Sequence, residues 1–152
     1  MSQIRYRIFV ILVFVFSQLN SQSTTEGDLE LLKNNIKVKT NNADLDLNRG
    51  DYHNGIIQLK SALEIANTIE SKSDIGIINT KLANLFLKLK ELDSAEVYIS
   101  RAIVIHSNLD DDINLAVSRY TNGLIYLEKK QYIQAIDLFT NSNIVFEENE
   151  LN

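Results

Sequence analysis

Residues 122–139 carry the clearest structural signal in this chain. They read Asn122-Gly123-Leu124-Ile125-Tyr126-Leu127-Glu128-Lys129-Lys130-Gln131-Tyr132-Ile133-Gln134-Ala135-Ile136-Asp137-Leu138-Phe139. Apolar residues recur every three or four positions, which is the spacing of one face of an α-helix. A polar run, Glu128–Gln131, interrupts the spacing before it resumes at Tyr132. The segment therefore predicts two amphipathic helices joined by a tight turn.

The same pattern occurs twice more upstream, at a spacing of forty residues. Small residues align with small ones, and large apolar residues align with large apolar ones. The aligned columns are Ala43, Ala83 and Gly123; Leu45, Leu85 and Ile125; Leu47, Leu87 and Leu127; Tyr52, Leu92 and Tyr132; Gly55, Ala95 and Ala135; Leu59, Ile99 and Phe139; Ala62, Ala102 and Ser142; and Ile65, Ile105 and Val145. An internal repeat of this length is typical of proteins in which one supersecondary unit stacks on the next.

Each repeat predicts one helix hairpin, so we expect an all-α chain of three antiparallel hairpins. In the first hairpin, Asp51 is the expected N-cap of the second helix and Gly50 the expected positive-φ turn residue. In the second, Asp93 with Glu96 three residues later resembles a capping box. Polar connectors, 70–74 and 107–112, join the hairpins. The expected helices lie near 28–48, 52–69, 74–89, 93–106, 112–129 and 132–147, in repeats of about 28–69, 74–106 and 112–147.

The composition agrees with long helices. The 152 residues include no proline and only five glycines, so the chain lacks the turn residues that all-β folds need. It also has no cysteine, which excludes disulfides, thiol catalysis and cysteine-based metal sites. We therefore expect the apolar helix faces alone to hold the hairpins together.

Small residues mark the expected helix crossings. Helix axes approach closely only where the side chains between them are small. We therefore expect Ala83 with Ala95, and Gly123 with Ala135, where the two helices of a hairpin touch. Ala62 and Ala102 are the expected contacts between hairpins, and Ser142 is expected to give the last helix a polar outer side.

In the third repeat, Gly123 is followed three positions later by Tyr126, and then by Tyr132, Ala135 and Phe139 after the turn. This arrangement resembles the tetratricopeptide repeat (TPR). The resemblance covers roughly residues 36–147, although Asp46 replaces an aromatic residue in the first repeat. Since the family repeat has 34 residues, these units resemble an extended variant. The resemblance implies a right-handed α-solenoid that binds a protein or peptide in its concave groove.

By similarity to the family, the groove positions lie on the first helix of each hairpin. They are Ile77, Thr80, Lys81, Asn84, Leu87 and Lys88 in the second hairpin and Val117, Tyr120, Thr121, Leu124, Leu127 and Glu128 in the third. The carboxylate clamp found in some family members is not inferred, because only Asn84 fits its pattern. The apolar stripe Tyr120, Leu124 and Leu127 either grips a peptide or packs within the solenoid.

The last hairpin ends with an apolar surface that has no following helix in the sequence. Phe139, Ile144, Val145 and Phe146 are its candidate end-on interface residues. Exposed apolar patches usually mark an interface. We expect either contact with another chain, such as a second copy, or a chain that is the front part of a longer protein.

Residues 1–23 resemble a secretory signal peptide. Arg5 and Arg7 precede the apolar run Ile8–Phe16 and a small polar stretch, with cleavage expected after Ser21 or Ser23. Nine helical residues span about 14 Å, too little for a stable membrane span, although a buried core helix is the alternative. Cleavage changes the net charge from −5 to about −7, because it removes two arginines and no acid. We therefore expect an exported protein, periplasmic or secreted, that binds no nucleic acid.

No catalytic or cofactor motif is present, and the only two histidines are His53 and His106. A solvated structural role is expected for His106, helix capping for Asp110–Asp112, and a solvated acidic tail for 148–152. The sequence predicts a non-enzymatic interaction module without metal or cofactor. The alternative is the extracytoplasmic sensory region of a bacterial signalling regulator.

Overall fold

The computed structural model describes residues 25–150, and 88% of these residues are helical. They contain no strand, which confirms the all-α prediction. The described helices are α2 (Glu26–Arg49), α3 (Tyr52–Thr68), α4 (Lys72–Lys88), α5 (Leu92–Asn108), α6 (Asp112–Glu128) and α7 (Tyr132–Glu150). The predicted signal peptide, residues 1–23, lies outside the described residues.

The turns between the helices repeat every twenty residues. One residue in each turn has positive φ, and these are Gly50, Glu70, Lys90, Asp110 and Lys130. After each of them, a backbone amide donates to the carbonyl five residues earlier, as Glu91 does to Phe86 at 3.0 Å. This is the Schellman geometry that ends helices. Gly50 was predicted, but the other four turn residues are not glycine and gave no such signal.

Several helix boundaries differ from those expected. Asp51 does cap α3, accepting from the Asn54 amide at 3.4 Å. Asp93 does not cap α5: the helix begins one residue earlier, and Glu91 precedes it without a side-chain bond to the helix. The cap of α6 is Asp111, which accepts from the Asn114 amide at 3.2 Å. Since α7 continues to Glu150, the expected acidic tail begins inside a helix.

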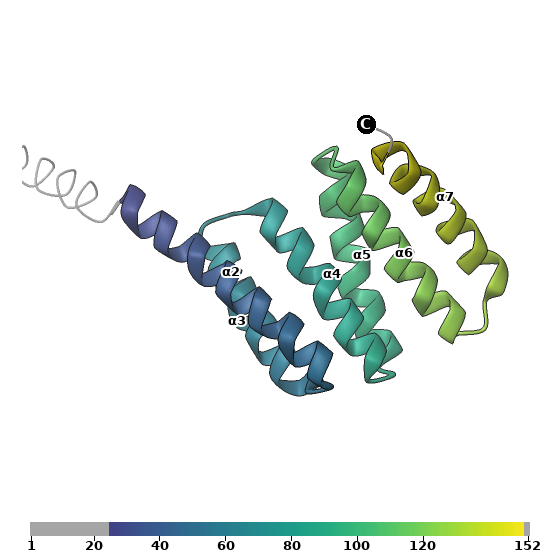
Figure 1. Ribbon diagram of the computed structural model, residues 1–152, viewed down its shortest axis with the longest axis horizontal. Coiled ribbons are helices and arrows are strands. Elements are labelled where there is room, and N and C mark those ends of the chain that lie inside the picture. Colours follow the sequence, from purple (N-terminus) through teal and green to yellow (C-terminus); the bar gives the residue numbers. More distant parts are fainter. Residues whose placement is uncertain (1–24, 151–152) are drawn as a thin grey trace, which may run out of the picture. The chain divides into compact units, whose positions relative to one another are not determined.

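Within residues 32–150, consecutive helices pack against each other in chain order (Figure 1). The pairs α4 with α5 and α6 with α7 form hairpins, and α3 and α6 pack on either side of the α4–α5 pair. α6 contacts α4 as well as α5. The second hairpin therefore has a helix on both sides, whereas the third has a described helix on one side only.

Small residues lie at buried positions, as expected for helix crossings. Ala83, Ala95 and Ala135 are at most 1% exposed. Gly123 is buried against the Phe139 ring, where an added Cβ would lie 2.6 Å from Cε1. The expectation for Ser142 was wrong: it is fully buried and donates to the Leu138 carbonyl at 2.8 Å, so it is a small core residue of α7.

None of the helices within residues 25–150 is long and apolar enough to span a bilayer.

Candidate functional site

An apolar stripe runs along the exposed side of α6. Val117, Tyr120 and Leu127 are each about two-fifths exposed, and Leu124 between them is half-buried. Their spacing of three and four residues places them on one side of the helix. Ile113 continues the stripe toward the start of α6. Four of the predicted groove residues therefore share a surface.

A second stripe on α7 lies beside the first. Tyr132 and Ile136 are more than half exposed, and Phe139 and Phe146 follow on the same side of the helix, half-buried. The Phe139 ring lies 5.0 Å from the Tyr120 ring, which joins the stripes of the two helices. We call the combined surface the terminal face; its residues are Val117, Tyr120, Leu124, Leu127, Tyr132, Ile136, Phe139 and Phe146.

The predicted end-on residues do not form one surface. Phe139 and Phe146 are seven residues apart and share a side of α7. By the same helical period, Ile144 and Val145 point in other directions. Ile144 is half exposed and Val145 is half-buried. Only the two phenylalanines belong to the terminal face.

The equivalent surface of the second hairpin is covered. Thr80 and Leu87, forty residues before Tyr120 and Leu127, are 6% and 8% exposed, and Ile99 is 1% exposed. α6 contacts both α4 and α5 there, and the Thr80 and Ser118 hydroxyls are 2.8 Å apart. An amphipathic helix is therefore what covers this surface where the chain supplies a neighbour.

Charged pairs border the covered surface. Lys90 in the α4–α5 turn bonds Glu128 at the end of α6, with 2.6 Å between Nζ and Oε2. Lys129 and Glu96 form a second pair at 2.5 Å. The residue equivalent to Lys90 in the last hairpin is Lys130, which has no ion-pair partner among the described residues.

The remaining predicted groove residues do not belong to the terminal face. In the second hairpin, Ile77 and Asn84 are half-buried, Lys88 is exposed, and Lys81 pairs with Asp44 of α2 at 2.7 Å. Asp44, Lys81 and Asn84 line a hollow of about 190 Å³. In the third hairpin, Thr121 is buried and donates to the Val117 carbonyl, while Glu128 faces Lys90.

The structure corrects the expectation for His106. Its side chain is fully buried, and neither ring nitrogen has a hydrogen-bond partner among the described residues. Nδ1 lies 3.6 Å from Asp111 Oδ2. Gly76 provides the space, because a Cβ there would lie 2.6 Å from the ring. The glycine on the adjacent helix was the only sequence signal for this position.

The carboxyl group of Asp111 has a perturbed pKa. The side-chain hydrogen bond from Asn114 holds the pKa of Asp111 below its ordinary value, and the Asn114 backbone amide acts in the same direction. These contacts are those of a helix cap. Within residues 25–150, no group of three or more His, Asp or Glu side chains is placed to hold a metal ion.

A scan against protein-family models and a search of curated proteins found no match for this chain.

Proposed function

We propose that this chain is an exported, non-enzymatic interaction module of the TPR type, an extended three-hairpin solenoid. Its terminal face binds an amphipathic helix of a protein partner. The forty-residue repeat, its resemblance to the family and the hairpin packing of α4 to α7 support this assignment.

The exposed terminal face is the observation that carries the proposal. Tyr120 and Leu127 are 41% and 43% exposed, whereas their equivalents Thr80 and Leu87 are nearly buried. Removing apolar surface from water lowers the free energy of the system, by about 25 cal/mol per Å². The repeat also indicates the shape of the occupant, since α6 covers the equivalent face. A partner helix lying across α6 and α7 would complete the pattern.

The charges at the rim define the partner further. Lys90 pairs with Glu128 near the end of the covering helix, and Lys130 is the equivalent cation without a described partner. We therefore expect the bound helix to carry a carboxylate near its C-terminal end. Glu96, the partner of Lys129, is replaced by Ile136 in the last hairpin, so an apolar residue is expected opposite it.

A photo-crosslinking experiment tests this proposal. A photoreactive phenylalanine analogue replaces Leu127 in the protein expressed in the cells that make it, and the crosslinked peptide is mapped by mass spectrometry. The matched control carries the analogue at Ile57, which is exposed on α3 outside the terminal face. We expect the Leu127 position alone to crosslink to an amphipathic helical segment. Equal crosslinking from both positions would contradict the proposal.

The rim charge gives a second measurement on the same segment. Lys130→Glu is expected to weaken binding of the mapped segment by about tenfold, while Lys72→Glu at the exposed start of α4 leaves it unchanged. Crosslinks to this same chain would identify a second copy as the partner. Equal binding by both variants would contradict the proposed contact between Lys130 and a carboxylate of the bound helix.

Export is tested separately. Intact-mass measurement of the protein recovered outside the cytoplasm is expected to show cleavage after Ser21 or Ser23. A full-length protein found in the cytoplasm would contradict this part of the proposal.

A further inference from the structure

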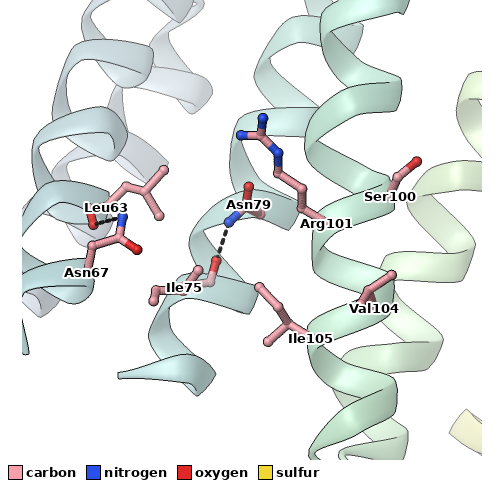
Figure 2. A pocket seen from close by; sticks show the side chains of 8 residues that line it. All are labelled: Leu63, Asn67, Ile75, Asn79, Ser100, Arg101, Val104 and Ile105. Atoms are coloured by element: carbon pink, nitrogen blue, oxygen red, sulfur yellow. Dashed lines mark hydrogen bonds between the residues drawn. The ribbon is translucent and has the colours of Figure 1, made fainter. Parts of the chain in front are cut away.

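A cleft of about 480 Å³ opens between α3 and α5, which both pack on α4 (Figure 2). Its walls are largely apolar and include Leu63 of α3, Ile75 of α4, and Val104 and Ile105 of α5. The volume is in the range of pockets that bind small molecules. The cleft lies on different helices from the terminal face and is not explained by the proposed function.

One buried polar group faces this cleft. Asn79 of α4 is 2% exposed, and its Nδ2 donates to the Ile75 carbonyl at 2.6 Å. Because a carbonyl can only accept, this bond fixes the orientation of the amide. The Oδ1 atom then points away from Ile75 and has no hydrogen-bond partner among the described residues (Figure 2). A buried acceptor in this position favours a ligand that donates a hydrogen bond.

A cation lies at the mouth of the same cleft. Arg101 of α5 is exposed, and no carboxylate in the described part of the chain pairs with it. Its guanidinium lies over the Tyr98 ring, 5.6 Å from the centroid. Figure 2 shows the guanidinium at the same end of the cleft as the Asn79 oxygen. An arginine held in this way can bind a carboxylate through two parallel hydrogen bonds.

This combination is not a general feature of the repeat. The residues equivalent to Asn79 are Lys39 and Arg119, both with long basic side chains, and the residues equivalent to Arg101 are Ser61 and Asn141. At these two positions, only the second hairpin therefore combines a short amide on its first helix with a cation on its second. The short amide leaves space that a longer side chain would fill.

We propose that this cleft binds a small N-acylated amino acid with an apolar side chain. The amide N–H of the ligand donates to Asn79 Oδ1, and its carboxylate bonds the Arg101 guanidinium. The acyl chain and the side chain then lie against Leu63, Ile75, Val104 and Ile105. Each feature of the ligand corresponds to one feature of the cleft.

A titration with N-hexanoyl-leucine tests the proposal on the full protein. In ¹H–¹⁵N NMR spectra, we expect shifts that saturate and are confined to residues of α3, α4 and α5 around the cleft. N-hexanoyl-leucine amide lacks the negative charge, and 2-hexanoyloxy-4-methylpentanoate has an ester oxygen in place of the N–H. Each is expected to bind about tenfold more weakly. Equal binding of all three probes, or no saturable shifts around the cleft, would overturn the proposal.

Two variants assign the contacts. Arg101→Gln changes an exposed residue and is expected to weaken binding of N-hexanoyl-leucine by about tenfold, while Arg119→Gln in the third hairpin leaves it unchanged. Asn79→Leu removes the acceptor and fills part of the cleft, so binding should be lost while the helical circular dichroism spectrum is retained. Wild-type affinity in both Arg101→Gln and Asn79→Leu would overturn the assignment.

Two further measurements separate this site from its alternatives. A short peptide ending in leucine is expected to bind more weakly than N-hexanoyl-leucine, and a peptide that binds more tightly would overturn the small-molecule assignment. The double variant Tyr120→Ser/Leu127→Ser alters the terminal face and should keep full affinity for the probe. Loss of probe binding in that variant would contradict a separate site between α3 and α5.

Discussion

The second and third hairpins have the same sequence pattern, but the second has a helix packed on both sides and the third has a described helix on one side only. Leu87 and Leu127 are identical residues at equivalent positions, yet the first is 8% exposed and the second 43%. The difference lies in the neighbours: α3 and α6 enclose the α4–α5 pair, whereas α7 ends the described packing. The same apolar residue is therefore part of the core in one hairpin and exposed surface in the other.

This difference also changes what a substitution costs. A side chain enclosed on all sides leaves a cavity when it is truncated, and an enlarged one has nowhere to move. On the last hairpin, the Leu127 side chain already contacts water, and no described helix holds α7 from its other side. Substitutions there should therefore cost less. Paired substitutions at equivalent positions measure this directly.

The largest difference is expected for leucine truncation. Leu87→Ala should lower the free energy of unfolding by about 2–3 kcal/mol, because it leaves a cavity in the buried core around α4. Leu127→Ala should cost less than about 1 kcal/mol, since its side chain already contacts water. Urea unfolding followed by circular dichroism measures both. Equal losses would show that the terminal face is covered within the protein itself.

The next effect is overpacking of the hairpin crossings. Ala95→Leu should cost about 2–3 kcal/mol, because α3 and α6 hold the second hairpin from both sides. Ala135→Leu should cost nearer 1 kcal/mol, since α7 can move away from α6. Thermal melts compare the two variants with the parent. Melting temperatures equal to that of the parent would remove these residues from the crossings.

A smaller, pH-dependent effect is expected at the start of α6. Asp111→Ala should cost about 1 kcal/mol at neutral pH through loss of the cap. The lowered pKa of Asp111 means that its contribution is present above the ordinary value of 3.8 and is lost as the pH falls through the lowered value. Glu91→Ala is the control, because Glu91 makes no side-chain bond to α5. A cost for Asp111→Ala that is unchanged in strong acid would contradict the cap.

The smallest effect is expected at the turns. Lys130 has φ of 60°, a conformation that costs a non-glycine residue about 1 kcal/mol. Lys130→Gly should therefore raise the unfolding free energy by about 0.5–1 kcal/mol, with a melting temperature about 2–4 °C higher. Lys90→Gly should gain less, because it also removes the ion pair with Glu128. A lower melting temperature for Lys130→Gly would contradict strain at this turn.

The elements themselves were largely predictable. All six described helices lie near their expected ranges. The spacing of apolar residues by three or four positions extends over a whole helix, so it remains recognisable where single residues depart from it. Their ends were less predictable. The turns at Glu70, Lys90, Asp110 and Lys130 are closed by backbone hydrogen bonds to the preceding helix. Such bonds do not require a particular side chain, so the sequence does not mark these positions.

The candidate site was predictable in part. The Tyr120, Leu124 and Leu127 stripe was visible as helical spacing, but its continuation through Tyr132 and Ile136 requires knowing how α7 lies on α6. Thr80 and Leu87 resemble groove residues in the sequence and are covered by α6. The positions of Thr80 and Leu87 in the repeat do not indicate whether another helix packs against them.

By itself, the sequence determined the all-α class, the forty-residue period and the small residues at buried positions, because these depend on local helical spacing and side-chain size. Only the tertiary structure decided that His106 is buried, that Asn79 faces a cleft and that the last apolar stripe remains exposed. Burial depends on which helix packs next to a residue, and that neighbour is distant in the chain, as Gly76 is from His106.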